Sequence, residues 1–191
     1  MKSYILTGTP SAGKTAILRQ LELDGFGVVE EAATDLIALW HARGVDQPWM
    51  EPWFLDAVAA LQQQRQIRAA SMADAIQFHD RSAICTAALA AFLGAPVTPG
   101  LAGELERIQR DAVYEKRAFF IRSLGFVAPT AARRISPEDA LRFERIHEET
   151  YRKFGFEIVS IEPGSVVERA RAIADAARPN TGDVTTRGAQ P

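Results

Sequence analysis

Residues 8–15 of the chain read Gly8-Thr9-Pro10-Ser11-Ala12-Gly13-Lys14-Thr15 (GTPSAGKT), which fits the pattern G-x-x-x-x-G-K-[ST]. A short apolar run at residues 3–7 precedes this stretch and is typical of a buried strand. Residues 15–23 follow it and repeat apolar side chains at helical spacing. A strand, a glycine-rich turn and a helix N-terminus together bind phosphate, because backbone N–H groups and the positive helix end face the anion. The alternative is a glycine-rich turn followed by a surface lysine. Because both flanking elements are present, we interpret the stretch as a phosphate-binding loop.

The residue types of this loop suit a nucleoside triphosphate. Gly8 and Gly13 allow backbone N–H groups to turn inward around phosphate oxygens. Lys14 is expected to bridge the β- and γ-phosphates as a point charge, and the Thr15 hydroxyl is expected to ligate Mg²⁺. The predicted nucleotide-binding residues are Gly8, Ser11, Ala12, Gly13, Lys14, Thr15 and Ala16.

The rest of the chain alternates short apolar strands with helices. Further strands are expected at residues 26–29, 75–79, 118–124 and 156–161. Helices are expected at residues 32–42, 54–72, 83–92, 104–116, 136–154 and 165–177, with a flexible connection at residues 94–103. This alternation predicts an α/β fold with a five-stranded parallel sheet covered on both faces. We expect residues 1–177 to form one domain, and residues 178–191, which have no apolar face, to form a disordered tail.

An acidic and a basic residue, Asp80 and Arg81, follow the third expected strand. In a parallel α/β sheet, functional residues gather where strands end, at the carboxyl edge. Asp80 there is a candidate to hold Mg²⁺ through water or to accept the proton of an acceptor hydroxyl. Arg81 is a candidate for a bidentate phosphate contact. The alternative is that Asp80 caps the next helix and Arg81 lies on the surface.

Two neighbouring acids, Glu30 and Glu31, end the second expected strand. A carboxylate facing the γ-phosphate could position or deprotonate an acceptor. Only one of the two can face the site, because neighbouring side chains alternate along a strand, and we favour Glu31. The alternative is that both are solvated acids at a helix start, where the helix dipole favours them.

A pair of arginines, Arg133 and Arg134, lies in the loop after the fourth expected strand. An arginine that closes over a triphosphate stabilises charge in the transition state of phosphoryl transfer. We assign this role to Arg134. The alternative is an ordinary basic pair on the surface.

Composition excludes several other classes of site. The net charge is −2, so neither nucleic acid nor an anionic membrane is indicated as the main partner. Cys85 is the only cysteine, which excludes an intramolecular disulfide and a cysteine-based zinc site. No apolar run is long enough to span a bilayer, and the N-terminus does not read as a signal peptide, so we expect a cytoplasmic protein. Cys85 is expected to be buried and inert, and His79 to be packed, because its side chain points to the opposite face from Asp80.

Four motifs, taken in order, resemble one family. They are GTPSAGKT, VVEEAATDLI, IQFHDRS and RRISPEDALRFERIHEETYRKFGFEIVSIEP. Over about residues 3–175 the chain is similar to the AAA_28 / NadR-like group of P-loop proteins, which includes the ribosylnicotinamide kinase domain of NadR. The resemblance implies the P-loop NTPase three-layer sandwich of nucleoside and nucleotide kinases, with strand order 2-3-1-4-5. It also implies that the chain binds ATP and Mg²⁺. Lys14, Thr15, Glu31, Asp80 and Arg134 match its motif residues.

Two functions are compatible with these motifs. The first is a small-molecule kinase that transfers the γ-phosphate of ATP to a hydroxyl of a nucleoside-like acceptor, with Asp80 or Glu31 orienting the acceptor. The second is a regulatory, nucleotide-dependent switch without a small-molecule acceptor. A GTP switch is disfavoured because no Asn-Lys-x-Asp stretch follows a strand. Three tryptophans, Trp40, Trp49 and Trp53, are interpreted as core, with a platform for a flat acceptor as the alternative.

Overall fold

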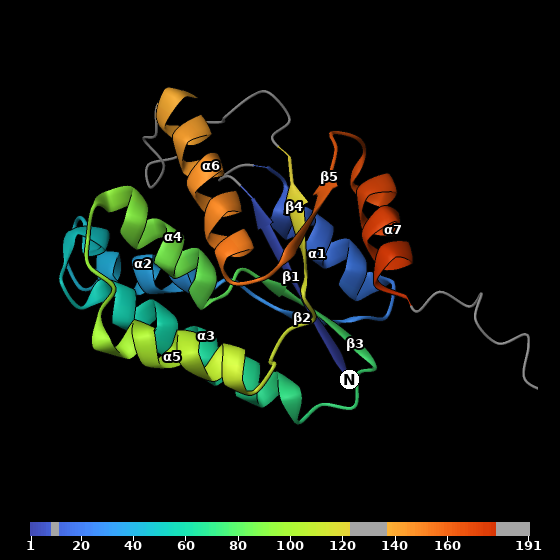
Figure 1. Ribbon diagram of the computed structural model, residues 1–191, viewed down its shortest axis with the longest axis horizontal. Coiled ribbons are helices and arrows are strands. Elements are labelled where there is room, and N and C mark those ends of the chain that lie inside the picture. The colour runs from blue at the N-terminus through green and yellow to red at the C-terminus, as the bar shows by residue number, and fades with distance from the viewer. Residues whose placement is uncertain (9–11, 123–136, 179–191) are drawn as a thin grey trace, which may run out of the picture.

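The computed structural model describes residues 1–8, 12–122 and 137–178. Its centre is a parallel sheet of five strands in the order β2-β3-β1-β4-β5 (Figure 1), as predicted. The strands are β1 (Lys2–Gly8), β2 (Gly27–Val29), β3 (Ile76–Asp80), β4 (Arg117–Ile121) and β5 (Glu157–Ile161). The register pairs Leu6 with Asp80 and Gly8 with Ile121. The carboxyl ends of β1, β3 and β4 therefore lie side by side.

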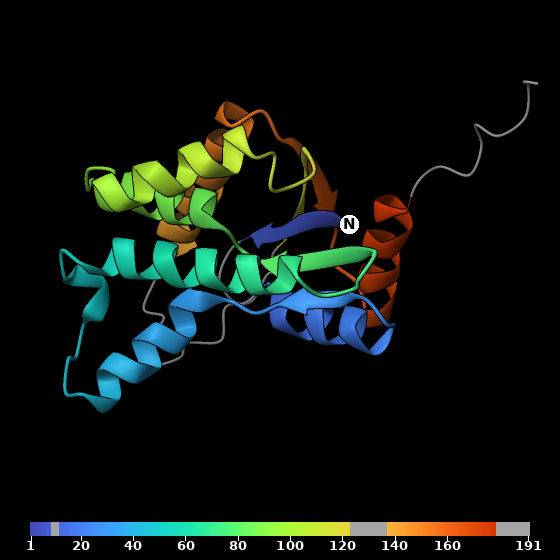
Figure 2. The ribbon, with the colours of Figure 1, turned by 90° about the horizontal axis from the view of Figure 1, so that it is seen from below.

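Helices cover both faces of this sheet, which gives three layers (Figures 1 and 2). One layer consists of α1 (Lys14–Leu23) and α7 (Val166–Ala177). The other layer consists of α3 (Phe54–Ala70), α4 (Ala83–Leu93), α5 (Pro99–Arg110) and α6 (Pro137–Lys153). The helix α2 (Ala32–Ala42) and the 3₁₀ turn η1 (Pro48–Met50) pack against α3. None of the helices in the described ranges combines the length and apolar character that a membrane-spanning segment needs.

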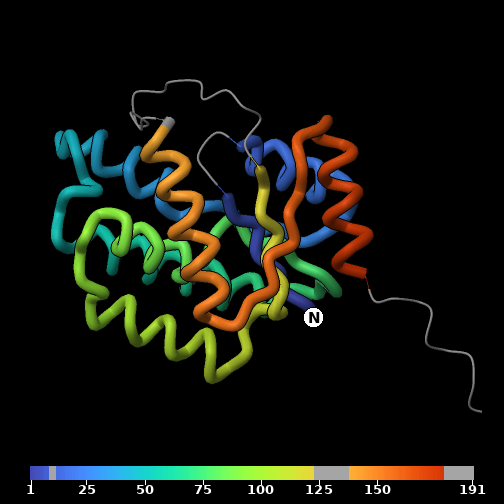
Figure 3. Tube along the Cα trace, turned by 45° about the horizontal axis from the view of Figure 1, so that its top comes forward, coloured from blue at the N-terminus to red at the C-terminus, as the bar shows by residue number. Residues whose placement is uncertain are grey.

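The central strand explains why both layers are needed. Tyr4 and Leu6 of β1 pack against α1 and α7, whereas Ile5 packs toward α4, α5 and α6. Residues 3–8 are all buried, so neither face of β1 meets solvent. This is why the strand reads as a continuous apolar run. Figure 3 shows the chain returning from α6 directly into β5, which completes the sheet.

One predicted element was wrong. The sequence indicated a flexible connection at residues 94–103 and a helix at 104–116, whereas α5 begins at Pro99 and ends at Arg110. The helix starts early because a side chain on α3 holds its first turn: Asp56 accepts hydrogen bonds from the Thr98 hydroxyl and from the backbone N–H of Leu101, the latter at 3.0 Å. Leu101 is buried, so this first turn belongs to the core. The disordered tail was predicted for residues 178–191. Arg178 directly follows α7 and pairs with Asp175 at 3.0 Å, and residues 179–191 lie outside the described part of the chain.

Candidate active site

The phosphate-binding loop predicted from the sequence joins the carboxyl end of β1 to the first turn of α1. Gly8 ends β1 with a φ of 133°, and a Cβ placed on it would lie 2.4 Å from the carbonyl oxygen of Ile121. Gly13 precedes α1 with a φ of 86°, in the left-handed region that favours glycine. Ala12 is fully buried, while Thr15 and Ala16 are exposed on the first turn of α1. Ser11 lies outside the described residues.

Lys14 is the first residue of α1 and lies within the site, with only 6% of its surface exposed. Its Nζ donates a hydrogen bond to the Gly8 carbonyl at 3.3 Å. Burial and the positive charge of Arg81 lower the pKa of Lys14 to about 8, against the opposing effect of Asp80 and Glu31. Charged residues at and after the carboxyl ends of β2 and β3 therefore act electrostatically on one lysine.

The turn after β3 carries the Asp80-Arg81 pair. Asp80 is the last residue of the strand and is buried. Arg81 has a φ of 72°, and its backbone N–H donates to the Leu6 carbonyl at 2.9 Å, which holds the turn against β1. The next residue, Ser82, caps α4 by accepting a hydrogen bond from the N–H of Ile84 at 3.3 Å. Because Ser82 is the cap, Asp80 is not needed to cap the helix, which was the alternative reading of this acid.

The two acids after β2 face different ways. Glu31 approaches Arg81, with its Oε1 atom 2.7 Å from Nε of the guanidinium, and both side chains are largely buried. Burial lowers the pKa of Arg81, but the charges of Glu31 and Asp80 together raise it above its ordinary value. Glu30 instead turns outward and pairs with Arg19 on α1. The structure thus brings Glu31 toward Lys14 and leaves Glu30 at the surface.

Glu31→Gln is expected to lower the free energy of unfolding by about 2 kcal/mol, because the nearly buried guanidinium of Arg81 loses its ion-pair partner and keeps only the charge of Asp80 nearby. The matched control is Glu30→Gln. Glu30 and Arg19 are each about half exposed, and this substitution is expected to change stability by less than about 0.5 kcal/mol. Urea denaturation of the two variants makes the comparison. Equal losses in both would contradict the buried pairing.

A buried polar cluster packs beside the turn that follows β3. The hydroxyl of Tyr151 on α6 lies 3.0 Å from the Ser82 hydroxyl and 3.1 Å from the Cys85 thiol. The thiol in turn lies 3.1 Å from the Thr7 hydroxyl, one residue before the phosphate loop. Burial raises the pKa of Tyr151 well above its ordinary value, so the hydroxyl stays protonated. Tyr151 lies within the fourth family motif, but no structural role was predicted for it.

His147 lies one turn before Tyr151 on α6 and was not singled out as a site residue. Its Nδ1 donates to the Phe143 carbonyl at 3.1 Å, since a carbonyl oxygen only accepts. Burial, together with the positive charges of Arg81 and Lys14, lowers the pKa of His147 to about 3, against the opposing effect of its hydrogen bond to Phe143. The ring is therefore neutral in the folded protein. The predicted packing of His79 is confirmed, since its buried ring meets Tyr114 edge-on at 5.1 Å.

The neutral His147 predicts a loss of stability in acid. Below about pH 6.5 the unfolded chain binds a proton at this histidine that the folded protein does not, so stability is complete above pH 6.5 and falls as the pH drops toward 3. The expected slope from this group is up to about 1.4 kcal/mol per pH unit. His147→Asn keeps a donor for the Phe143 carbonyl but does not titrate, so urea denaturation at pH 7, 6 and 5 should give a shallower slope. Identical slopes would contradict the assignment.

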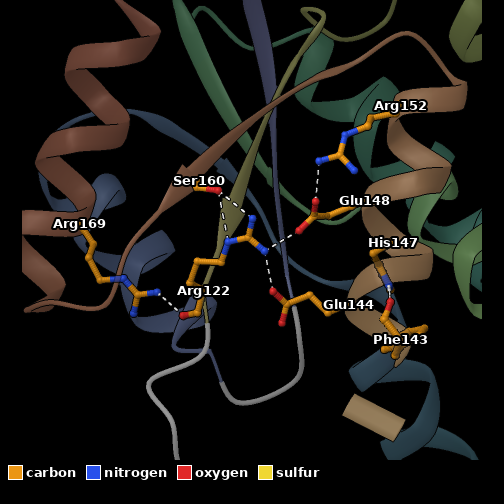
Figure 4. Close-up of polar contacts among 8 residues, drawn as sticks. All are labelled: Arg122, Phe143, Glu144, His147, Glu148, Arg152, Ser160 and Arg169. Carbon is orange, nitrogen blue, oxygen red and sulfur yellow. Dashed lines mark hydrogen bonds and ion pairs between the residues drawn. The ribbon is translucent and has the colours of Figure 1, made fainter. Parts of the chain in front are cut away.

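Two arginines, Arg122 and Arg169, link elements around the phosphate loop, and Figure 4 shows their contacts with one another, with α6 and with β5. Arg122, directly after β4, bonds through its guanidinium to Glu144 and Glu148 on α6 and to the Ser160 hydroxyl on β5. Arg169, on α7, donates to the carbonyls of Ala12 and Arg122. Neither was predicted, because both roles depend on contacts between distant parts of the chain. Arg133 and Arg134 lie outside the described residues.

The residues at this edge fit a magnesium ion in the type of their donor atoms. Asp80 and Thr15 offer oxygen, which Mg²⁺ prefers, and a single carboxylate with one hydroxyl leaves room for water and phosphate oxygens. Within the described ranges, no group of three or more histidine, cysteine or acidic side chains could hold a metal by itself. Two open grooves of about 390 and 400 Å³ lie elsewhere, beside the edge strand β2 and at the amino end of the sheet. Their linings include neither Lys14 nor Asp80.

A family model matches most of the chain. The model is AAA_28, described as an AAA domain, and it matches residues 3–169. A search of curated proteins found no match.

Several solved structures share the fold. A structure of NadR protein in complex with NAD and AMP-PNP has 22% sequence identity and a TM-score of 0.67, and the match covers 99% of this chain and 52% of that one. The chain thus spans about half the length of that NadR chain. A deoxyadenosine kinase from M. mycoides with bound dATP has 13% identity and a TM-score of 0.61, with coverage of 92% and 98%. A shikimate kinase from Acinetobacter baumannii in complex with shikimate has 14% identity and a TM-score of 0.55, with coverage of 92% for both chains.

Proposed function

The chain belongs to the AAA_28 family of AAA domains, and from that premise we propose that it is an ATP-dependent kinase of a small hydroxyl compound. The observation that carries the proposal is the environment of Lys14. This buried lysine begins the helix after the phosphate loop and lies under the charges of Arg81, Asp80 and Glu31. A cation for the phosphates and a carboxylate for the acceptor hydroxyl are two of the groups that catalyse phosphoryl transfer to a hydroxyl.

The similar structures support the same class of reaction. Two of the three proteins are named as kinases, one for deoxyadenosine and one for shikimate, and the NadR structure holds AMP-PNP, an ATP analogue. Their acceptors differ, so the family fold is compatible with several small hydroxyl compounds. We propose a nucleoside-like acceptor for this chain, because NadR structures, one of them in complex with NR, have the higher sequence identities.

In this proposal the chain's own residues divide the work. The backbone N–H groups around Gly13 and the ammonium of Lys14 hold the β- and γ-phosphates, while Thr15 and Asp80 hold Mg²⁺. The metal, when bound, neutralises charge on the phosphates. Glu31, or Asp80 in its place, orients the acceptor hydroxyl and accepts its proton. The hydroxyl oxygen bonds to the γ-phosphorus as the bond from that phosphorus to the β–γ bridging oxygen breaks, and ADP leaves.

Arginines are proposed to stabilise the charge that develops during transfer. Arg81 is held beside Lys14 by its ion pair with Glu31, so its guanidinium is in place before substrates arrive. Arg134 is proposed as a second such group, from the loop after β4. ADP and the phosphorylated acceptor are the products, and a reaction of this kind draws on cytoplasmic ATP.

The test is direct phosphorylation. The protein is incubated with ATP and Mg²⁺, and in parallel with GTP, against a panel of nucleosides that includes ribosylnicotinamide, and against shikimate. Mass spectrometry then detects any new phosphate ester, with Lys14→Met as the inactive control. An ester made by the wild type and not by the variant supports the proposal. ATP binding without any phosphorylated acceptor would contradict it and favour a nucleotide-dependent switch.

A further inference from the structure

Arg169 on α7 is a buried cation. Only 4% of its surface is exposed, and burial lowers its pKa below the ordinary value. Within the described ranges its hydrogen-bond acceptors are two backbone carbonyls, Ala12 at 3.0 Å and Arg122 at 2.9 Å, and no carboxylate forms an ion pair with it. Burying a guanidinium without an opposing charge is unfavourable by itself. The burial of the Arg169 guanidinium therefore indicates a role other than stabilising the fold.

The first carbonyl belongs to the phosphate loop. The peptide bond between Ala12 and Gly13 is planar and trans, so its C=O and N–H groups point in opposite directions. Because Arg169 holds the Ala12 carbonyl toward α7, the Gly13 N–H points away from α7. Gly13 has a φ of 86° and adopts positive or negative φ with similar ease, so this peptide plane is free to rotate unless something holds it.

The second carbonyl fixes the arginine to a rigid part of the fold. Arg122 donates its own N–H to Ile161 on β5 at 3.0 Å, and its side chain bonds to Glu144 and Glu148 on α6 (Figure 4). One guanidinium therefore spans the phosphate loop and the end of β4. The planar fork of arginine suits two carbonyls at once, which a lysine ammonium does not reproduce.

We propose that Arg169 is the positioning residue that holds the Ala12–Gly13 peptide so that the Gly13 N–H donates to a bound nucleotide phosphate. The inference rests on the proposed function in one respect, that a nucleotide occupies this loop. The guanidinium also places a fixed positive charge behind the loop, where it attracts the same anion. Arg169 acts through Gly13 and through its field, and takes no part in the chemical step.

The experiment compares Arg169→Met with Arg171→Met. Arg171 is on the same helix, but its side chain is 83% exposed and pairs at 3.8 Å with Asp175. Isothermal titration calorimetry with ATP and Mg²⁺ should show Kd raised about ten- to hundred-fold in Arg169→Met, the range of a lost charge-assisted hydrogen bond. Arg171→Met should bind ATP like the wild type. Arg169→Lys should be intermediate, because it keeps the charge but not the fork.

A second readout separates positioning from simple loss of stability. Amide hydrogen exchange is followed by NMR at ATP concentrations that saturate every variant. In the wild type, ATP should protect the Gly13 amide, because this N–H donates to a phosphate. In Arg169→Met the Gly13 amide should exchange at least about tenfold faster, while the Leu6 amide in the centre of β1 reports global stability.

Each outcome bears on the inference. An unchanged Kd in Arg169→Met, or full Gly13 protection in that variant at saturation, would overturn it. Equal acceleration at Gly13 and Leu6 would also overturn it, since it would indicate a purely structural role. A wild-type protein that binds ATP but phosphorylates no acceptor would contradict the proposed kinase and leave the Arg169 comparison valid. A wild type that does not bind ATP would overturn both.

Discussion

Lys14→Met is expected to abolish phosphoryl transfer and, at the same time, to raise the free energy of unfolding. The folded protein holds the Lys14 ammonium almost out of water, with its pKa lowered to about 8 first by burial and then by Arg81. A methionine of similar length removes the buried charge, so we expect a gain of about 1 to 3 kcal/mol at pH 7. The same change removes the cation that faces the transferred phosphate, so kcat should fall at least about a thousandfold.

Two measurements check this pair of effects. Urea denaturation gives the stability, and product formation with the best acceptor from the panel gives kcat. Lys153→Met is the matched control, because Lys153 is exposed on the last turn of α6 and both quantities should stay near wild type. If Lys14→Met lost both activity and a large part of its stability, this would refute the idea that the buried Lys14 charge serves function and destabilises the fold. Activity within tenfold of wild type would refute its role at the phosphates.

Gly8→Ala is expected to lower the free energy of unfolding by about 3 to 5 kcal/mol, although it adds only one methyl group. The added Cβ would lie 2.4 Å from the Ile121 carbonyl oxygen, well inside van der Waals contact. The Cβ is bonded directly to the backbone of β1 and the oxygen belongs to the backbone of β4, so neither atom moves without disturbing the pairing of the two strands. The φ of 133° adds strain for any residue with a side chain.

Gly25→Ala separates the backbone strain of a positive φ from the steric clash with Ile121. Gly25 also has a positive φ, 88°, but a Cβ there meets no other atom within 4 Å. Its replacement should lower stability by about 1 kcal/mol, the effect of backbone strain alone. Urea denaturation of both variants gives the difference that is due to the steric clash with β4. If the two variants lose the same stability, β1 and β4 are not held as closely as the structure shows.

The phosphate loop and the sheet could be predicted because their signals are local. Residues 8–15 carry their own motif, and side-chain alternation predicted that only one of Glu30 and Glu31 faces inward. The start of α5 could not be predicted in the same way. It depends on Asp56, which is 45 positions away from the Leu101 amide that it caps.

The contacts of Arg169 and Tyr151 could not be predicted for the same reason, because their partners lie far away in the sequence. Arg169 reaches a carbonyl 157 positions earlier in the chain, and Tyr151 reaches Ser82 across 69 positions. Nothing in the sequence next to either residue indicates these partners. Their roles arise only when the parallel sheet brings α6 and α7 to the two sides of the phosphate loop.

The thiol of Cys85 gives the protein a built-in reporter of opening. It is the only thiol in the sequence, and it lies buried between Thr7 on β1 and Tyr151 on α6. A reagent in solution therefore reaches it only when α6 and α4 separate from the strand that leads into the phosphate loop. The labelling rate of the unmodified wild-type chain measures how often that separation occurs, and a ligand that tightens the loop slows the reaction without any change to the sequence.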